Sequence, residues 1–251
     1  MDDFQKRFSG VGSLLGEEAL ENLKNSHFLI IGLGGVGTWT VESLARSGVG
    51  KFTLVDLDDI CVSNTNRQIH ALEGSYGEMK AEALAKRVKL INPDCEVEVV
   101  LSYFNQKSAE KILSQDYSLV VDAIDSVEDK CLLLNECFKR KLKVVTVGGA
   151  GGKVDPTKIT VAELSKTKQD MLLKGVRKKL KRDYHYPLGR GKAKVKAVYS
   201  YEPSKKFEVC DIQKNVKLDC NGGLGTTTYM TGIFGFMLSH IAIEEFLKTK
   251  R

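Results

Sequence analysis

Short apolar runs alternate with amphipathic segments through the first half of the chain. Four runs are apolar at nearly every position, as is typical of strands buried on both faces of a sheet, at 28–31, 52–55, 118–121 and 144–147. A fifth run, 97–101, alternates with acidic residues and predicts a more exposed strand. Segments of helical spacing separate these runs, at 38–47, 77–90, 108–113 and 132–138. This alternation predicts an α/β fold, a Rossmann-like, doubly wound and mostly parallel sheet with helices on both faces.

The pattern changes after a glycine-rich stretch at 148–152. Two later apolar runs, 159–162 and 195–201, predict strands of an antiparallel continuation in the second half. Residues 1–15 read as a polar leader and 16–24 as a short amphipathic helix. No repeat or low-complexity linker interrupts the chain, so the pattern predicts a single domain over 1–251, with a nucleotide-binding core at 26–150, a loop-rich basic substrate-binding part at 151–227 and a closing helix at 228–248.

The closing helix contains the most apolar stretch of the chain, residues 230–243. This stretch is shorter than a membrane span requires, and it includes Ser239 and His240. We therefore interpret it as a buried helix and expect no membrane partner.

A glycine-rich turn follows the first apolar run and precedes the first long helix. Its sequence, GLGGVG, contains Gly32, Gly34, Gly35 and Gly37. A strand, a glycine turn and a helix bring free backbone N–H groups and the positive end of a helix dipole to one point, where a phosphate binds well. The next strand ends at Asp56, whose carboxylate can accept hydrogen bonds from ribose hydroxyls. In this context the motif predicts a nucleotide site, the alternative being a purely structural turn.

The segment after Asp56 contains polar residues at helical spacing. If 63–69 forms a helical turn, Asn64, Arg67 and Gln68 lie at i, i+3 and i+4 and share one face. Two amides and a guanidinium on one face suit an anion clamp, and Lys80, at a helix start, adds a second positive charge. The alternative is a solvated polar turn.

Two acidic residues follow the buried run at 118–121. Ligands of open α/β sheets bind outside the carboxyl ends of the strands, so we expect the carboxylates of Asp122 and Asp125 to face one crevice. Asp125 is the candidate ligand for a Mg²⁺ ion that bridges phosphates, although it also suits the N-terminus of the helix after Ser126.

A basic segment occupies 174–196, where ten Lys and Arg residues accompany one Asp. Such a cluster attracts a phosphate backbone, and the interleaved Tyr184, His185 and Tyr186 could stack on an unpaired base. The alternative is a solvated charged face. The candidate nucleic-acid contacts are Lys178, Lys179, Lys181, Arg182, Arg190 and Lys192.

Composition adds limits to this picture. The net charge of +6 is modest, so its distribution matters more than its sum. Six cysteines without a CxxC pair, and no signal-peptide pattern, favour a reducing cytoplasm and leave no obvious zinc site. Cys220 stands in a glycine-flanked turn, where it is either a small structural residue or an activated thiol. His70 and His240 are interpreted as structural histidines with satisfied ring nitrogens.

The motifs GLGGVG, DLDDICVSNTNRQ, GEMK and DAID, in this order and spacing, resemble the ubiquitin-activating-enzyme-like (ThiF/MoeB-type) superfamily of ATP-dependent adenylating enzymes. Within it, NTNRQIHAL, INPDC, DAIDS, VTVGGAGGKVDPT and the DC-x-x-G-x-G turn resemble the bacterial tRNA threonylcarbamoyladenosine dehydratases. The resemblance spans nearly the whole chain and is weakest over 182–209.

This resemblance implies a reaction and a set of contacts. Such enzymes bind ATP and Mg²⁺, transfer AMP to a carboxylate and release pyrophosphate, and here the carboxylate would belong to threonylcarbamoyladenosine beside the anticodon of a tRNA. The carbamoyl group would then close a ring and expel AMP. The implied catalytic residues are Asn64, Arg67, Lys80 and Asp125. The implied ATP contacts are Gly32, Gly34, Gly35, Gly37, Asp56, Asp58, Asn64, Arg67, Gln68, Lys80, Asp122 and Asp125, with Asp125 as the Mg²⁺ ligand.

The resemblance also bears on partners. Superfamily members are commonly homodimers in which an arginine of the leader reaches the neighbouring subunit, but here Ser13 stands where one is expected and Arg7 is the remaining candidate. A sulfur-transfer protein partner and a monovalent cation stay open. The main rival function is adenylation of the C-terminus of a small sulfur-carrier or ubiquitin-like protein. An NAD-dependent dehydrogenase leaves Arg67 and Lys80 unexplained, and a non-catalytic subunit does not fit an intact ATP motif.

Overall fold

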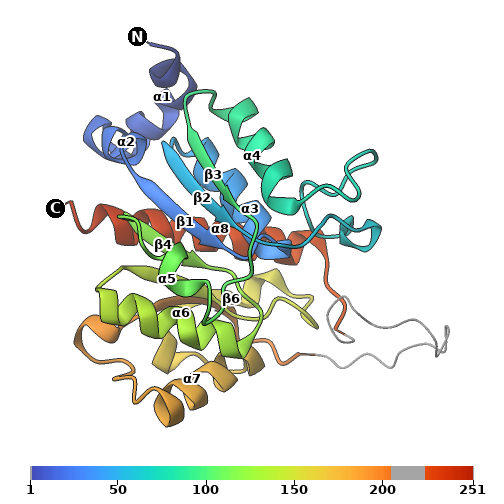
Figure 1. Cartoon of the computed structure of the whole chain (residues 1–251), viewed down its shortest axis with the longest axis vertical. Helices are drawn as coiled ribbons and strands as arrows, with labels where there is room; N and C mark the ends of the chain where they lie inside the picture. Colours follow the sequence, from blue (N-terminus) through green and yellow to red (C-terminus); the bar gives the residue numbers. More distant parts are fainter. Residues whose placement is uncertain (1, 205–223, 251) are drawn as a thin grey trace.

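A computed structural model describes residues 2–204 and 224–250, in which seven strands form a single sheet (Figure 1). The strand order is β3-β2-β1-β4-β5-β7-β6. All neighbouring strands pair in parallel except β6 and β7, which are antiparallel. The strands are β1 (His27–Ile31), β2 (Lys51–Val55), β3 (Glu96–Val100), β4 (Leu119–Asp122), β5 (Val144–Val147), β6 (Ile159–Glu163) and β7 (Lys196–Ser200). The prediction of a mostly parallel sheet with an antiparallel continuation is confirmed.

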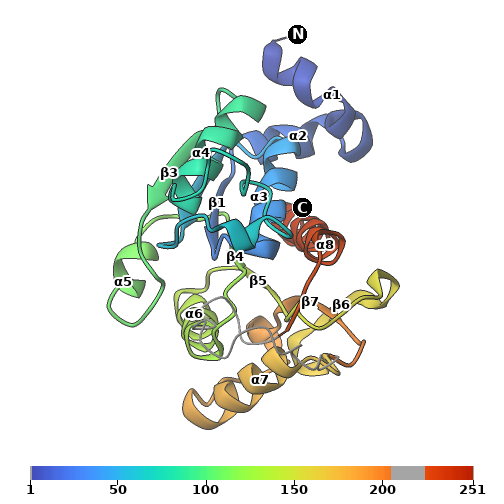
Figure 2. The ribbon, with the colours of Figure 1, turned by 90° about the vertical axis from the view of Figure 1, so that its right-hand side faces the viewer.

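Helices cover both faces of this sheet. Helices α3 (Gly35–Arg46), α4 (Lys80–Ile91) and α8 (Thr228–Leu247) pack in one hydrophobic cluster, and α5 (Ala109–Ile112) and α6 (Val127–Arg140) pack in another. Figure 2 shows α3 and α8 on one side of β1, β4 and β5, with α5 and α6 on the other. The remaining elements are α1 (Asp3–Leu15), α2 (Glu17–Lys24), α7 (Met171–Asp183) and the 3-10 turns η1 (Val62–Asn64), η2 (Pro156–Lys158), η3 (Leu164–Lys166) and η4 (Gly191–Ala193).

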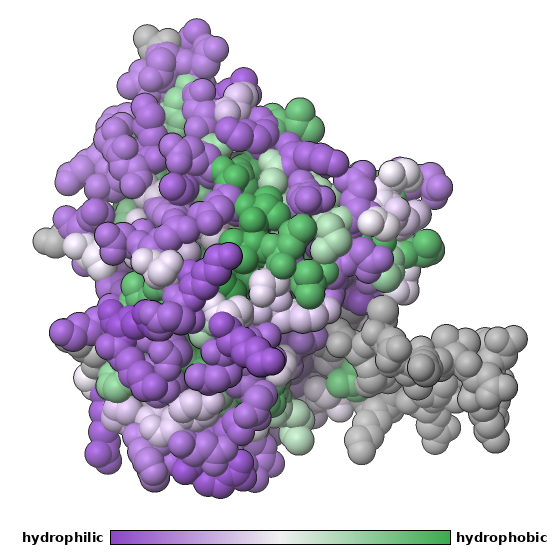
Figure 3. Space-filling view, in the orientation of Figure 1, coloured by the Kyte–Doolittle hydropathy of each residue, from purple (hydrophilic) through white to green (hydrophobic). Residues whose placement is uncertain are grey.

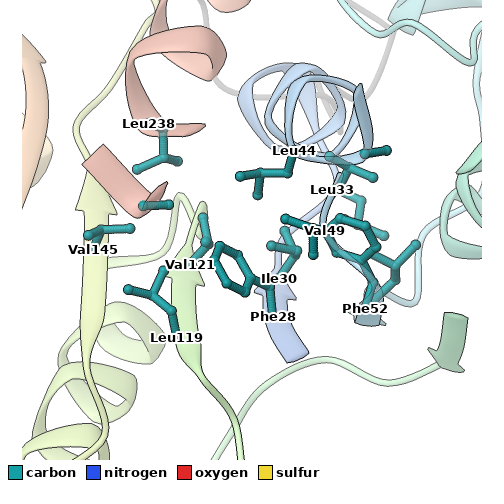
Figure 4. Close-up of a cluster of buried hydrophobic side chains, with 14 of the residues drawn as sticks. Phe28, Ile30, Leu33, Leu44, Val49, Phe52, Leu119, Val121, Val145 and Leu238 are labelled. Atoms are coloured by element: carbon teal, nitrogen blue, oxygen red, sulfur yellow. The ribbon is translucent and has the colours of Figure 1, made fainter. Parts of the chain in front are cut away.

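The central strand β1 explains why its sequence is apolar without interruption. Phe28 and Ile30 are fully buried on the α3–α8 side, where they pack with Phe52, Val121 and Leu238 (Figure 4). Leu29 and Ile31 are buried on the opposite side, in the cluster under α5 and α6. Since successive side chains of a strand point to opposite faces, a strand between two helical layers needs apolar residues at every position.

Helix α8 begins and ends within one residue of the positions expected from the sequence. By length and composition alone it could cross a membrane, but 56% of its most apolar window is buried within the protein. Its buried residues pack on α3 and on the sheet, so the helix belongs to the core as predicted.

Two segments differ from the sequence prediction. The leader is helical as α1, because Asp2 caps the backbone N–H of Gln5 at 2.7 Å and the buried Phe4 and Phe8 pack against Leu20 of α2. The basic segment is also less irregular than expected.

The first part of that segment, up to Asp183, belongs to helix α7. Leu173, Val176 and Leu180, at i, i+3 and i+7, are fully buried against α6 and the strands beyond it. This spacing is typical of an amphipathic helix, but the basic residues between the three apolar positions make it hard to recognise in the sequence.

Candidate active site

A crevice of about 1020 Å³ lies at the carboxyl ends of β1, β2, β4 and β5. Its wall includes residues from the segments that follow each of these strands. Ten of the residues predicted from the sequence as ATP contacts line it: Gly32, Gly34, Gly35, Asp56, Asp58, Asn64, Arg67, Gln68, Lys80 and Asp125. The expected gathering of these residues at one edge of the sheet is therefore observed.

The glycine turn between β1 and α3 brings backbone into this wall. Gly32 has a φ of +89°, and a Cβ there would lie 2.7 Å from the backbone oxygen of Ala123. Gly34 is the N-cap of α3 and faces open space, so its backbone can approach a ligand. Gly37 does not line the crevice: a Cβ there would lie 1.9 Å from the oxygen of Gly32, so this glycine allows α3 to start close to the strand.

The carboxylate of Asp56 is fixed by the backbone at the end of β2. It accepts the N–H of Leu33 at 2.6 Å and the N–H of Asp58 at 2.8 Å. Burial raises the pKa of Asp56 despite these two hydrogen bonds. The second hydrogen bond also orients the loop that carries Asp58.

Asp58 holds Lys80 at the start of α4. The Lys80 Nζ lies 2.8 Å from Oδ2 of Asp58, and the hydroxyl of Tyr103 donates to Oδ1 at 2.7 Å. Burial would raise the pKa of Asp58, but the hydrogen bonds from Lys80 and Tyr103 outweigh it and lower the pKa. The same contact raises the pKa of Tyr103 to about 12. Tyr103 lines the crevice and was not predicted from the sequence.

The predicted polar turn forms around η1. Asn64 is buried, and its side chain accepts a hydrogen bond from the backbone N–H of Cys61 at 3.1 Å. Asn64 therefore stabilises the turn and also lines the crevice. The Arg67 guanidinium donates to the carbonyl of Ser63 at 2.7 Å and to Oδ1 of Asn66 at 3.0 Å. In the described part of the chain no carboxylate forms an ion pair with Arg67. The Oε1 atom of Gln68 is buried and has no hydrogen-bond partner among the described residues. This turn thus presents a positive charge to the crevice.

The expectation that Asp122 faces the crevice is wrong. Its side chain is fully buried. Its Oδ2 lies 2.8 Å from Nζ of Lys130 and accepts a hydrogen bond from the hydroxyl of Thr146 at 2.6 Å. Asp122 is the last residue of β4, so its side chain still lies between the sheet and α6. Asp125, three residues later, is exposed and lines the crevice, as does Asp129, which was not predicted.

The basic surface is presented mainly by α7. Lys178, Lys181, Arg182 and Arg190 are exposed, and the surface over α7 at the bottom of Figure 3 is almost entirely hydrophilic. Lys179 is half-buried between Glu128 and Asp183. The side chain of Lys192 and all of Cys220 lie outside the described residues.

The expected base-stacking role does not suit Tyr186. This side chain is buried, and its ring packs 5.1 Å from that of Phe138, centre to centre. Tyr184 is partly buried in the same cluster, so of the three interleaved aromatics His185 is the exposed one.

Three further predicted residues lie away from the crevice wall. Arg7 is exposed on α1, which packs on α2 at the amino ends of the strands, so it does not contact the crevice of its own chain (Figure 1). His240 is exposed on α8. His70 is buried, but the prediction of satisfied ring nitrogens is wrong: within the described residues neither nitrogen has a hydrogen-bond partner. Burial, together with the nearby charges of Lys80 and Arg87, lowers the pKa of His70 to about 4.

Comparison with known proteins identifies the family of this chain. Residues 10–250 match the model of the ThiF family. The chain is 42% identical to the tRNA threonylcarbamoyladenosine dehydratase of Haemophilus influenzae, covering 100% of this chain and 97% of that protein. It is also 42% identical to the dehydratase of Escherichia coli, covering 98% and 95%. The crystal structure of the E. coli dehydratase in complex with ATP superposes with a TM-score of 0.89 at 40% identity, over 100% of this chain and 97% of that one.

Proposed function

The chain belongs to the ThiF family, and within it to the tRNA threonylcarbamoyladenosine dehydratases, and from this premise we propose what its crevice does. The reaction is the ATP-dependent dehydration of N6-threonylcarbamoyladenosine beside the anticodon of a tRNA. The observation that carries the proposal is the meeting of the glycine turn, Arg67 and Lys80 in one crevice. The rival function, adenylation of a small carrier protein, is disfavoured because the full-length relatives are dehydratases.

The reaction proceeds in two steps. The substrate carboxylate attacks the α-phosphorus of ATP, which forms an acyl-adenylate and releases pyrophosphate. The carbamoyl group of the same side chain then attacks the acyl carbon, closes a ring and expels AMP, so that one water is lost from the nucleoside. Because nucleophile and electrophile belong to one molecule, the protein need not supply a nucleophile. No cysteine or histidine occurs among the described residues that line the crevice.

The side chains of the crevice serve the first step. The backbone at Gly32, Gly34 and Gly35 receives phosphate oxygens at the start of α3, and the Asp56 carboxylate accepts hydrogen bonds from the ribose. Arg67 and Lys80 stabilise the negative charge that develops on the phosphates, with Asn64 and Gln68 beside them. Lys80 exchanges part of its contact with Asp58 for the phosphate.

Asp125 is the proposed ligand for the Mg²⁺ that accompanies ATP. Its carboxylate is exposed and lines the crevice, where it can share an ion with the phosphate oxygens of the nucleotide. When bound, Mg²⁺ neutralises phosphate charge and polarises the reacting phosphoryl group. The variant Asp125→Asn should raise the Mg²⁺ concentration needed for half-maximal pyrophosphate release, and an unchanged requirement would exclude this role.

The exposed basic face of α7 is the proposed tRNA contact. Lys178, Lys181 and Arg182 lie at i, i+3 and i+4 on the helix, so their charges share one face, and Arg190 follows the helix. The substrate in turn requires a cytoplasmic location, where mature tRNA and ATP occur together.

A homodimer is proposed from an exposed aromatic strip on α3 and α8. The ring of Trp39 lies 6.0 Å from that of Phe236, which is 48% exposed, and Tyr229 on the same helix is equally exposed. A second copy would cover these apolar side chains and could bring Arg7 to the partner's crevice. Phe236→Glu should shift the mass measured by light scattering from dimer to monomer; a monomeric wild type would refute the dimer. A monovalent cation, a sulfur-transfer protein partner and a role for Cys220 stay predictions.

The decisive experiment compares acceptors. The protein is incubated with ATP, Mg²⁺ and either tRNA that carries threonylcarbamoyladenosine, the same tRNA without the modification, or a small carrier protein. AMP and pyrophosphate should appear with the modified tRNA alone, and the mass of its nucleoside should fall by one water. Arg67→Ala should lower this rate on the order of 10²–10³-fold. Pyrophosphate exchange with the carrier protein alone would establish the rival function.

A further inference from the structure

The crevice has a second end that the nucleotide motifs do not account for. In the strand order, β2 and β1 carry the phosphate-binding residues, and β5 lies on the far side of β4. The chain leaving β5 forms the second wall with Gly148, Gly149, Ala150 and Gly151, and Leu172 of α7 completes it. We call these five residues the β5 wall. None of them has a charged or hydrogen-bonding side chain, so the wall presents backbone groups and apolar atoms.

The β5 wall is attached to α7 through one buried carboxylate. Asp170, the N-cap of α7, is 2% exposed. Its Oδ1 accepts the N–H of Leu173 at 2.9 Å, and its Oδ2 accepts the N–H of Gly149 at 3.0 Å. A Cβ on Gly148 would lie 2.2 Å from the same Oδ2, so the turn rests directly on the carboxylate. The position of the wall therefore follows the position of α7.

The chemistry of this wall differs from that of the phosphate end. The ligand that fits glycine backbone, Ala150 and Leu172 is a planar, uncharged ring, because such a group gains from burial without an ionic partner. A phosphate would find no cationic side chain on the five residues of the wall. β4, which Asp125 follows, lies between the two ends, so a ligand on the β5 wall can extend a carboxylate toward the nucleotide.

We propose that the β5 wall is the subsite for the modified nucleoside of the tRNA, and that Asp170 is the positioning residue that sets this wall relative to the basic helix α7. This inference rests on the proposed function. A tRNA held by the exposed face of α7 would place its nucleoside at the first turn of the same helix, where Leu172 lines the crevice. Helix α7 then binds the phosphate backbone of the tRNA and also forms one side of the nucleoside subsite.

Two glycine positions allow the two ends to be tested separately with a single methyl group. A Cβ on Gly149 would touch Leu172 alone, at 3.9 Å, and a Cβ on Gly34 would meet no atom within 4 Å. Neither glycine has a positive φ, so both alanine variants should fold. Gly149→Ala should lower kcat/KM for modified tRNA about 10- to 200-fold, with the Kd for ATP unchanged. Gly34→Ala should instead weaken ATP binding.

Two further variants protect the test against a folding defect. Asp170→Asn leaves one of the two N–H groups without an acceptor and should raise KM for modified tRNA more than it lowers kcat, with ATP binding by calorimetry unchanged. Leu172→Ala should act in the same direction. Leu172→Ala should melt within a few degrees of wild type and so carries the test without a folding defect. Asp170→Asn also removes the carboxylate 4.0 Å from the buried Lys153 and should melt lower, so its KM and kcat are compared at a temperature where it is folded.

The outcomes separate this proposal from the proposed function. A wild-type protein that releases no pyrophosphate with modified tRNA would refute the function itself. An active wild type whose Gly149→Ala and Leu172→Ala variants keep the KM for tRNA, or lose ATP affinity as Gly34→Ala does, would refute the nucleoside subsite alone. Loss of kcat, tRNA KM and ATP affinity together in Asp170→Asn would assign Asp170 a general structural role and overturn the positioning role.

Discussion

The ammonium group of Lys80 lies 2.8 Å from the carboxylate of Asp58, at the edge of the crevice that the glycine turn also lines. Lys80 is almost fully buried while Asp58 is about half exposed, so the cation is held in place and the carboxylate can still reach solvent. Asp58 acts as a counter-ion that keeps a buried positive charge in position until a phosphate shares it.

Removing that charge tests its role in the chemical step. Lys80→Ala should lower the rate of pyrophosphate release on the order of 10²–10³-fold, because a positive charge would be lost where negative charge develops. Asp58→Asn should cost only about tenfold, the worth of one hydrogen bond to a charged group, since Lys80 keeps its charge. Lys86→Ala, on the exposed side of α4, is the matched control. Equal losses for Lys80→Ala and Lys86→Ala would exclude the role assigned to Lys80.

The basic face of α7 makes a prediction about salt. The double variant Lys178→Glu with Lys181→Glu should weaken tRNA binding and flatten its dependence on salt concentration, because fewer counter-ions are released from the tRNA. ATP affinity should stay unchanged. The control reverses two exposed lysines elsewhere, Lys89 of α4 and Lys107 of the turn before α5. Filter binding between low and physiological salt measures how steeply tRNA affinity falls with salt concentration. The same slope in both double variants would contradict the role of α7 in tRNA binding.

His70 predicts how stability depends on pH. Burial lowers its pKa from 6.5 in the unfolded chain to about 4 in the folded protein. Between these values the unfolded chain binds the proton and the folded protein does not, so stability is full above pH 6.5 and is lost as the pH falls toward 4, by about 3 kcal/mol in total. Urea unfolding of His70→Phe should lack this part of the slope. His240→Gln, at an exposed site, should retain it; a wild-type slope in His70→Phe would contradict the assignment.

The buried pair below the crevice predicts a stability cycle. Lys130→Met would leave the Asp122 charge without its partner in a fully buried site, at a cost of about 3–5 kcal/mol. Asp122→Asn should cost a similar amount, because it strands the Lys130 charge. The double variant should recover much of the loss, since Asn can still accept from Thr146. Denaturant unfolding of the four proteins gives the coupling energy, and additive losses would show that the two charges are independent.

The sequence allowed the sheet and the phosphate end of the crevice to be predicted, because both depend on local patterns. The strands β1 and β2 are short apolar runs, and Gly34 and Asp56 stand where a strand–turn–helix unit requires them. The errors concern pairings between distant residues. Asp122 follows a buried strand just as Asp125 does, and its partner Lys130 is visible only once α6 packs on the sheet.

The second end of the crevice was missed for the same reason. Gly149 and Leu172 are separated in the sequence and meet through Asp170 only in the folded chain. Helix α1 and Tyr186 were misread because a polar majority concealed the few apolar positions that decide their burial.

Helix α8 has a consequence for how the protein is made. Its twenty residues pack on α3 and on β4, β5, β6 and β7, yet they are translated after all of these elements. While the ribosome still holds this segment in its exit tunnel, the strands already released expose an uncovered apolar side. We expect stable folding to wait until α8 has left the tunnel, so that a chain interrupted two turns before the end of α8 would aggregate rather than fold as a shortened enzyme.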